Sequence, residues 1–418
     1  MKAQLAQVTA ADVDAAAERL AGRVTRTPIT PSERLSSATE AQVWLKREDL
    51  QSVRSYKSRG ATNFIAQLSQ AQQDAGVVCA SAGNHAQGVA FACAQLGVHA
   101  RIYLPRTTPR QKRDRVAALG GVFIDIVVGG DSYDAAAGAA SDHADTTGST
   151  LVPAFDHPMT IAGQGTVVRE VIEDLAGVPD VVVVPVGGGG LLAGASAYLR
   201  ERHPEVRVVG VEPAGAASMG AALRAGGPVM LPHIDPFVDG AAVRRVGDTT
   251  YPLIRDAGAE VISVAEGRIC VEMIALYQTE GIVAEPAGAL APAVLDAIGI
   301  EPGQRVVAIL SGGNNDVLRY PEVMERALVH EGRKHYFLVE FPQEPGALRR
   351  FLDEVLGPDD DIALFEYVKR SNRETGPALV GIELGSPADL VPLLERLDAS
   401  SMQVEQIPHD SPLFRFIL

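Results

Sequence analysis

The chain has 418 residues, of which 46% are hydrophobic, enough for two or three domains with cores of their own. Its formal net charge of −15 and its isoelectric point near 5.1 argue against nucleic acids and anionic membranes as partners. The three scattered cysteines, Cys79, Cys93 and Cys270, predict neither a disulfide framework nor a zinc site.

The N-terminal segment lacks the charged-then-apolar pattern of a signal peptide. Instead it predicts a helix from Thr9 to Leu20, in which Thr9 and Asp12 have the spacing of a capping box. The long uncharged window 181–199 contains Pro185 and four glycines, so it predicts a buried strand, loop and helix rather than a membrane span. We therefore expect a cytoplasmic protein without a transmembrane segment.

Short apolar runs, each followed by an alanine-rich helical pattern, recur along the first three quarters of the chain. They predict strands at 77–80, 100–104, 122–126, 181–184, 206–211 and 305–310. This alternation is typical of parallel sheets with helices on both faces. Ligands of such folds bind at the carboxyl ends of the strands.

Small polar loops follow three of these strands. They are Ser81–Gly88, the four glycines Gly187–Gly190, and Ser311–Asn314. The glycines lead from a β-branched strand into a helix that starts at Leu191, so their backbone N–H groups form an anion cradle. A flexible linker is the alternative, but the apolar strand and helix on either side oppose it. Because the loop lacks both common nucleotide patterns, we expect a different phosphate-bearing ligand.

A fourth segment, Ser55–Ala61, carries Lys57 between Arg54 and Arg59. Taken alone, such a lysine belongs to a solvated cationic patch. Together with the three polar loops, it predicts one cofactor site built around Lys57.

The last part of the chain has a different composition. Residues 331–418 hold 16 acidic and 9 basic side chains, a net −7 in about a fifth of the chain. The pattern predicts strands at 336–341, 362–370, 378–384 and 402–407 and helices at 347–356 and 387–398, which is the ferredoxin-like order. Within it, Phe341–Leu348 is either a place where an amino-acid effector approaches the backbone or an ordinary β–α turn.

On the motif Ser55–Ala61, the loop Ser81–His85, the four glycines and Ser311–Asn314, the chain resembles the biosynthetic threonine deaminases (threonine dehydratases) over essentially its whole length. The resemblance implies an α/β fold with two parallel-sheet subdomains of pyridoxal phosphate fold type II, followed by a C-terminal ferredoxin-like (ACT-like) α+β domain. We expect a catalytic domain at 1–329, with a smaller subdomain inserted at about 55–150, and a regulatory domain at 330–418.

The resemblance also implies roles for individual residues. Lys57 would bind pyridoxal 5′-phosphate covalently and act as the catalytic base, Asn84 would contact the 3′ oxygen of the cofactor, and Ser311 would face the pyridine nitrogen. The phosphate would lie on Gly187, Gly188, Gly189, Gly190 and Leu191. The substrate would be held by Ser81, Ala82, Gly83, Asn84 and His85, although the imidazole of His85 is expected to be structural. A neutral serine partner makes the ring a weaker electron sink, which favours loss of a β-leaving group.

The implied reaction converts L-threonine, and also L-serine, into a 2-oxo acid and ammonia. Isoleucine would inhibit it, valine would oppose isoleucine, and the chain would form a homotetramer. The acid that assists the leaving hydroxyl is either the cofactor phosphate or Glu285, which precedes Pro286 and would otherwise be a helix cap. Segments 153–158 and 163–166 are expected to form substrate-pocket and helix-packing elements.

Two rival functions stay open. Serine racemases and catabolic serine/threonine dehydratases share the cofactor loops, but racemisation requires a second base where this chain has Ala82. Their cation site is also imperfect here, because Glu212 and Ala216 fit while Ser218 replaces an acidic ligand, so we expect no metal. A non-catalytic amino-acid sensor is the other rival, and the intact cofactor loops oppose it.

Overall fold

The computed structural model describes residues 8–367, 374–408, 411 and 413–417. The chain divides into two compact units, residues 1–316 and 317–418, which are considered separately. The boundary expected between residues 329 and 330 lies inside helix α14 (Tyr320–His330) and remains a prediction.

The larger sheet of the first unit has six strands in the order β1-β2-β10-β7-β8-β9. Their bounds are β1 (Ile29–Pro31), β2 (Gln42–Arg47), β7 (Val181–Pro185), β8 (Arg207–Pro213), β9 (Glu260–Val264) and β10 (Arg305–Leu310). All neighbours pair in parallel except β1, which is antiparallel to β2. Strand β7 is fully buried because helices cover both faces of the sheet, as expected of a parallel sheet.

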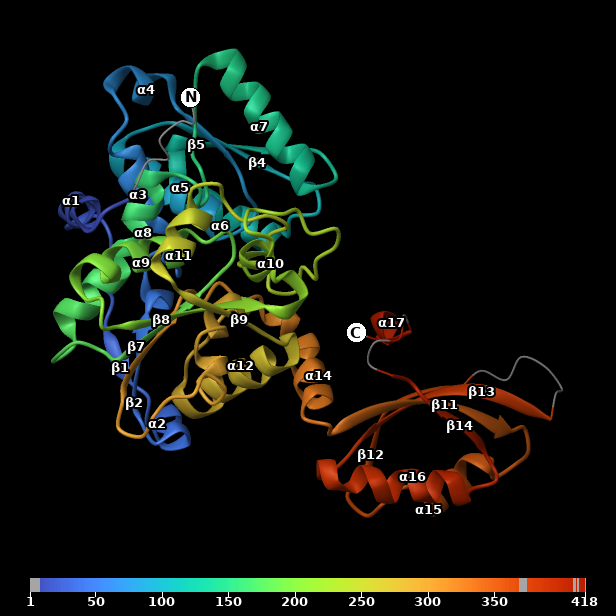
Figure 1. The fold of residues 1–418 in the computed structure, drawn as a ribbon. Helices are drawn as coiled ribbons and strands as arrows, with labels where there is room; N and C mark the ends of the chain where they lie inside the picture. Colours follow the sequence, from blue (N-terminus) through green and yellow to red (C-terminus); the bar gives the residue numbers. More distant parts are fainter. Residues whose placement is uncertain (1–7, 368–373, 409–410, 412, 418) are drawn as a thin grey trace. The chain divides into compact units, whose positions relative to one another are not determined.

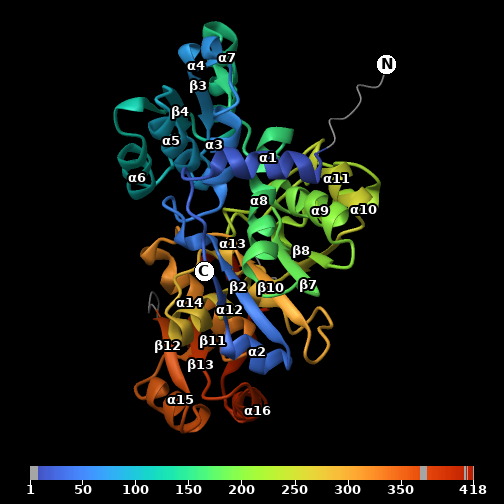
Figure 2. The same ribbon diagram turned by 90° about the vertical axis from the view of Figure 1, so that its left-hand side faces the viewer.

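Helices on the two faces of this sheet complete the core. On one side lie α1 (Ala10–Leu20), α8 (Pro158–Asp174), α9 (Gly190–Arg202), α10 (Ser218–Ala225) and α11 (Thr250–Ala257), with α12 (Glu266–Glu280) on the other (Figures 1 and 2). The remaining elements are α2 (Glu33–Thr39), α13 (Pro286–Ala289) and the short 3-10 helices 48–50, 214–216 and 292–294. The capping box expected at Thr9 and Asp12 is confirmed at the start of α1.

A second, four-stranded parallel sheet has the order β5-β4-β3-β6. Its strands are β3 (Val77–Ala80), β4 (Ala100–Leu104), β5 (Ile124–Val128) and β6 (Thr150–Leu151). Helices α3 (Lys57–Ile65), α4 (Gln70–Ala75), α5 (Asn84–Leu96), α6 (Arg110–Gly120) and α7 (Tyr133–Thr147) accompany it. The two parallel sheets confirm the α/β class expected of this part of the chain.

The second unit contains an antiparallel sheet in the order β12-β13-β11-β14. Its elements are β11 (Lys334–Pro342), α15 (Ala347–Val355), β12 (Asp361–Tyr367), β13 (Thr375–Glu383), α16 (Leu390–Ala399) and β14 (Gln403–Gln406), with α17 (Phe414–Ile417) near the end. Helices α15 and α16 lie together on one face of the sheet (Figure 1). The strand order confirms the ferredoxin-like fold, in which the first and third strands are central.

Several predicted bounds are corrected. The strand expected at 122–126 begins at Ile124, because a 3-10 turn at 121–123 leaves Val122 exposed to solvent. The helix expected at 387–398 starts as a 3-10 turn at 387–389 with Ser386 as its cap. The strand expected at 362–370 ends at Tyr367, and positions 368–370 lie outside the described residues.

Candidate active site

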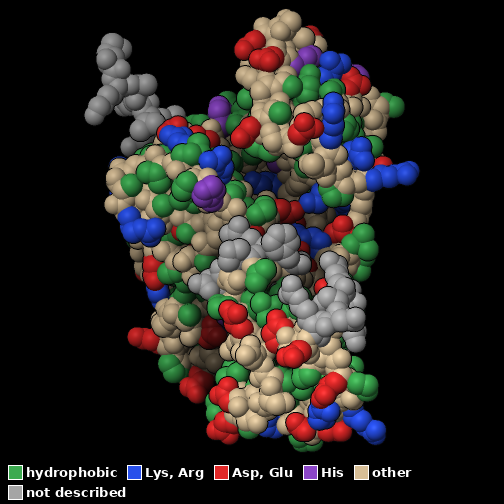
Figure 3. Space-filling model, turned by 90° about the vertical axis from the view of Figure 1, so that its right-hand side faces the viewer, with side chains coloured by type: hydrophobic (Ala, Val, Ile, Leu, Met, Phe, Trp, Pro, Cys, Tyr) green, Lys and Arg blue, Asp and Glu red, His purple; other side chains and the backbone are tan. Residues whose placement is uncertain are grey.

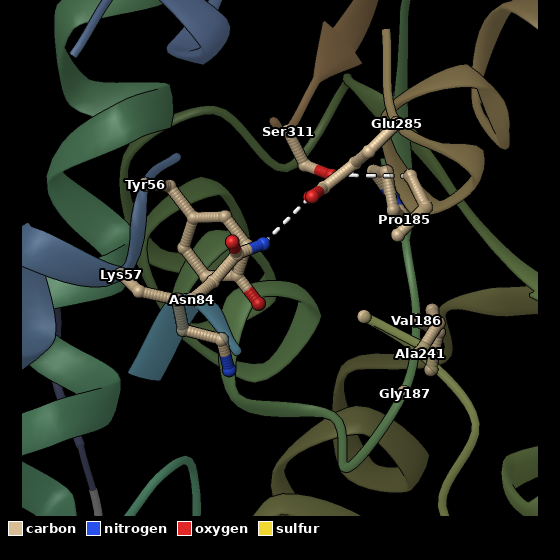
Figure 4. A pocket seen from close by; sticks show the side chains of 11 residues that line it. Tyr56, Lys57, Asn84, Pro185, Val186, Gly187, Ala241, Glu285 and Ser311 are labelled. Carbon is tan, nitrogen blue, oxygen red and sulfur yellow. Dashed lines mark hydrogen bonds between the residues drawn. The ribbon is translucent and has the colours of Figure 1, made fainter. Parts of the chain in front are cut away.

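One pocket of the first unit gathers the predicted segments at the carboxyl ends of β7 and β10 (Figure 4). It is lined by Tyr56, Lys57, Asn84, Pro185, Val186, Gly187, Gly240, Ala241, Glu285, Ala287 and Ser311. The structure thus places residues from all four segments that the sequence singled out around one space.

Backbone hydrogen bonds hold the Lys57 segment against the loop after β10. Tyr56 N donates to Ser311 O (3.2 Å) and Gly313 N donates to Arg54 O (2.9 Å). Arg54 adopts a left-handed conformation (φ 54°), which turns the chain just before Lys57. In the pocket, Lys57 Nζ donates to Ala154 O (3.2 Å) and lies 5.1 Å from the centre of the Tyr56 ring.

Glycines allow helix α3, which begins at Lys57, to pack closely against its neighbours. A Cβ on Gly60 would lie 2.3 Å from the Gln164 side chain, and one on Gly163 would lie 2.8 Å from Gly60 Cα. On α5, a Cβ on Gly88 would lie 2.9 Å from Lys57 O. These contacts fix the position of the Lys57 backbone, and they support the helix-packing role expected of segment 163–166.

Arg59 does not belong to a solvated cationic patch, because its side chain is fully buried. It pairs with Glu48 (2.8 Å) and Glu170 (2.6 Å), and Lys46 pairs with Glu170 as well (2.6 Å). Burial disfavours the charge of Glu48, but the charge and hydrogen bonds of Arg59, the charge of Lys46 and the hydrogen bond from Thr27 together outweigh it and hold the pKa of Glu48 below its ordinary value. Two buried cations therefore balance two carboxylates behind α3.

The glycine loop ends at the N-terminus of α9. Gly189 is the N-cap residue in a left-handed conformation (φ 93°), and no side chain of the described residues caps the helix. A Cβ on Gly188 would lie 2.4 Å from the Phe155 ring, and Thr250 Oγ1 donates to Gly188 O (2.7 Å). Close packing against Phe155 and the hydrogen bond from Thr250 therefore fix the loop, of which Gly187 lines the pocket.

Glu285 is the N-cap residue of α13, but its side chain makes no capping hydrogen bond. Instead its Oε1 accepts a hydrogen bond from Asn84 Nδ2 (2.6 Å), as Figure 4 shows. Burial, reinforced by the charge of Asp239, raises the pKa of Glu285 to about 7, while Asn84 and Lys112 act in the opposite direction. The carboxyl group can therefore hold or release a proton near neutral pH.

Basic side chains also lie at the rim of the catalytic unit. The face seen in Figure 3 is hollowed in its upper half, and Lys and Arg side chains gather around the hollow. Lys112 of α6 forms an ion pair with Asp239 (2.6 Å), next to the pocket residue Gly240. This pair connects the smaller sheet's helices to the loop that lines the pocket.

The loop after β3 contributes Asn84 to the pocket lining, whereas Ser81, Ala82, Gly83 and His85 are not among the lining residues. Ser81 Oγ accepts a hydrogen bond from Gly83 N (3.3 Å). The imidazole Nε2 of His85 lies 3.0 Å from Val152 O, and burial together with the charge of Lys57 lowers its pKa to about 4. This environment supports a structural imidazole, and the substrate roles of the loop remain predictions.

Some lining residues had no expected role. Tyr56 directly precedes Lys57, and Gly240 and Ala241 come from a long segment without regular structure. Proximity to Lys57 could have singled out Tyr56. Nothing in the sequence around Gly240 marks it, because its position depends on the course of a loop.

Comparisons with known proteins identify the family. Residues 20–312 match the model of the pyridoxal-phosphate dependent enzymes, and residues 325–417 match that of the C-terminal regulatory domain of threonine dehydratase. The chain belongs to the pyridoxal-phosphate dependent enzymes. It is 61% identical over 416 residues to the biosynthetic L-threonine dehydratase of Mycobacterium tuberculosis, covering 99% of this chain and 97% of that protein. The Bacillus subtilis enzyme is 48% identical over 94% of each chain.

Solved structures agree with the family. Tomato threonine deaminase isoform 2 in its processed form has a TM-score of 0.72 at 37% identity, over 76% of this chain and 92% of that one. Maize serine racemase has a TM-score of 0.71 at 30% identity, over 77% and 98%. The catalytic unit is therefore similar to both a deaminase and a racemase.

The pocket residues fit pyridoxal 5′-phosphate, the cofactor of the family. The Lys57 amine can bond to an aldehyde, and the uncapped start of the 13-residue helix α9 can receive a phosphate. A Cβ on Gly187 would lie 2.9 Å from Ala241 Cα, so this part of the cradle admits only glycine. Ser311 Oγ donates to Ala287 O (3.1 Å) and keeps lone pairs for a donor in the pocket.

Glu212 of the suspected cation site has other partners. Both carboxylate oxygens of Glu212 accept backbone hydrogen bonds, from Met219 N and Gly220 N (2.8 Å each). Within the described ranges, no group of three or more His, Cys, Asp or Glu side chains could hold a metal ion. Among the helices described, none is both long enough and apolar enough to cross a membrane.

Proposed function

We propose that this protein deaminates L-threonine to 2-oxobutanoate and ammonia, and accepts L-serine as well. The observation that carries the proposal is the convergence of Lys57, Asn84, Gly187 and Ser311 on one pocket. The close similarity to biosynthetic threonine dehydratases over nearly the whole chain supports this substrate.

The residues that the sequence singled out each have a proposed task. Lys57 holds the cofactor and its freed amine removes the α-proton of the substrate. Residues Gly187 to Leu191 hold the phosphate, Ser311 faces the ring nitrogen, and the loop Ser81–His85 receives the substrate carboxylate. When bound, pyridoxal 5′-phosphate supplies the electron sink for the α-carbon.

Loss of the β-hydroxyl requires a proton. We propose Glu285 as the donor because its carboxyl group is in the pocket and its pKa of about 7 leaves it partly protonated at neutral pH. Asn84, which donates to Glu285 Oε1, holds the group in one orientation. The cofactor phosphate is the alternative donor.

Serine racemisation is the second candidate, because the maize racemase shares the fold of the catalytic unit. The side chain at position 82 opposes it, since Ala82 has no proton to exchange. Chiral analysis of L-serine reactions distinguishes the two functions. The proposed deaminase is expected to convert L-serine into pyruvate without forming D-serine. D-serine as the main product would support the racemase.

Regulation is proposed for residues 325–417, which match the regulatory domain of threonine dehydratase. There we expect isoleucine to inhibit and valine to oppose it, by shifting an equilibrium between oligomer states of unequal activity. We expect the protein to be cytoplasmic and to form a homotetramer. Activity with L-threonine measured against isoleucine concentration, alone and with valine, tests this. Activity that does not respond to isoleucine would remove the feedback proposal and leave the reaction intact.

The reaction itself is tested with purified holoenzyme. We expect 2-oxobutanoate and ammonia to appear from L-threonine in a one-to-one ratio without added divalent cations. Bound cofactor without any turnover of threonine or serine would favour a different reaction, and protein that binds no cofactor would favour a sensor.

A further inference from the structure

A row of three polar side chains runs from the loop after β10 into the pocket. Asn314 donates from Nδ2 to Asn84 Oδ1 (2.7 Å), and Asn84 donates from Nδ2 to Glu285 Oε1 (2.6 Å). Figure 4 shows the second of these bonds. Asn84 and Glu285 line the pocket, whereas Asn314 does not. Its side chain therefore acts on the site through Asn84, while its backbone N–H hydrogen-bonds Glu285 directly.

The backbone fixes the direction of this row. Asn314 Nδ2 also donates to Val53 O (2.8 Å), four residues before Lys57. A carbonyl oxygen can only accept, so the Asn314 amide must turn its NH2 group towards Val53 and Asn84. Asn84 must then turn its oxygen towards Asn314. Its own NH2 group is left facing Glu285 and the pocket.

The orientation of the Asn84 amide matters because there is little free space around its partner Glu285. A Cβ on Gly312 would lie 2.2 Å from Glu285 Oε1, and one on Gly240 would lie 3.6 Å from the same atom. Glu285 is only 4% exposed. If the Asn84 amide were reversed, its oxygen would face a carboxylate oxygen with little water to replace the lost bond, which is costly in a buried site.

We propose that Asn314 is a positioning residue of the active site, which holds the Asn84 amide with its N–H groups towards Glu285 and the pocket. The inference rests on the proposed function and on the expected contact between Asn84 and the cofactor's 3′ oxygen, to which the second N–H of Asn84 would donate. Asn314 thereby orients the two N–H groups of Asn84, one for Glu285 and one for the cofactor, before the cofactor and substrate bind. The hydrogen bond to the Val53 carbonyl fixes Asn314 itself.

Asn314→Asp in the holoenzyme tests this role, because aspartate has nearly the same shape but cannot donate in its ionised form. We expect kcat for L-threonine to fall about tenfold or more, as for the loss of a buried hydrogen bond. The pH midpoint of the bound cofactor's visible absorption change is expected to move by roughly half a unit or more. Asn315→Asp introduces the same charge one position later and should change neither quantity.

A double-mutant cycle shows whether Asn314 acts through Asn84. Asn314→Ser, which keeps a shorter donor, should retain more activity than Asn314→Asp and confirm that the loop tolerates substitution. In an Asn84→Ala background, Asn314→Asp should have little further effect on kcat or on the absorption midpoint.

The inference would be overturned if Asn314→Asp changed kcat and the absorption midpoint by the same amount in the wild-type and Asn84→Ala backgrounds. It would also be overturned if Asn314→Asp and Asn315→Asp changed these two quantities equally. If the wild-type protein does not deaminate L-threonine, the proposed function fails instead, and the absorption midpoints of the same variants still decide the role of Asn314.

Discussion

The titration of Glu285 predicts how the stability of the cofactor-free protein depends on pH. Its pKa is raised from 4.5 to about 7 in the folded protein, chiefly by burial. A raised pKa means that the folded state prefers the protonated form. The stability associated with this proton is fully present below pH 4.5 and is lost as the pH rises through 7.

The size of the effect follows from the difference of pKa. At about 1.36 kcal/mol for each unit, the shift corresponds to roughly 3 kcal/mol in total, most of it lost between about pH 5 and pH 8.5. Glu285→Gln keeps the shape and the acceptor for Asn84 but cannot ionise. The variant should therefore gain about 2 to 3 kcal/mol of stability relative to the wild type over this pH range.

Urea unfolding of the cofactor-free proteins, followed at several pH values, measures this difference. Glu301→Gln removes a carboxylate from an exposed position and serves as the matched control. If the free-energy difference between Glu285→Gln and the wild type were the same at pH 5 and pH 8.5, the raised pKa would be refuted.

Three further predictions follow from contacts around the site. Gly312→Ala would place a methyl group 2.2 Å from Glu285 Oε1, so kcat should fall while the urea midpoint changes little by comparison. Arg59→Met leaves Glu48 and Glu170 without their shared partner and should cost about 3 to 5 kcal/mol; a thermal midpoint within about 2 °C of the wild type would contradict this. Asp239→Asn should lower the pKa of Glu285 and Lys112→Met should raise it, which moves the pH-stability curve in opposite directions.

Much of the fold was predictable because its signals are local. The strands that became β3, β4, β7 and β10 are short, mostly apolar runs followed by helical patterns, and the order of strands and helices along the second unit follows from its own periodicity. Strands β1, β2, β6 and β9 were missed. Strands β1 and β9 lie at the two edges of the larger sheet, and their side chains are mostly half-buried or exposed, so their apolar signal is weak. Strand β6 has only two residues, and the inner strand β2 carries Gln42, Lys46 and Arg47 among its six residues.

Some residues of the site were likewise predictable from local signals, and others were not. Lys57, Asn84, Gly187 and Ser311 were identifiable because each lies in a short motif whose residue types suit the chemistry. The buried partners of Arg59 were not, because Glu48 and Glu170 come from segments 11 and 111 residues away whose approach only tertiary packing determines. The contact of Asn314 with Asn84 likewise joins segments 230 residues apart.

The most direct test of the proposed function compares the wild type with Lys57→Ala. Both purified proteins are supplied with pyridoxal 5′-phosphate and L-threonine, and 2-oxobutanoate is measured over time. We predict steady release by the wild type and a loss on the order of 10³-fold or more in the variant, because the group that holds the cofactor and moves the α-proton is gone. Equal rates for the two proteins would contradict the assignment of Lys57 and, with it, the active site described above.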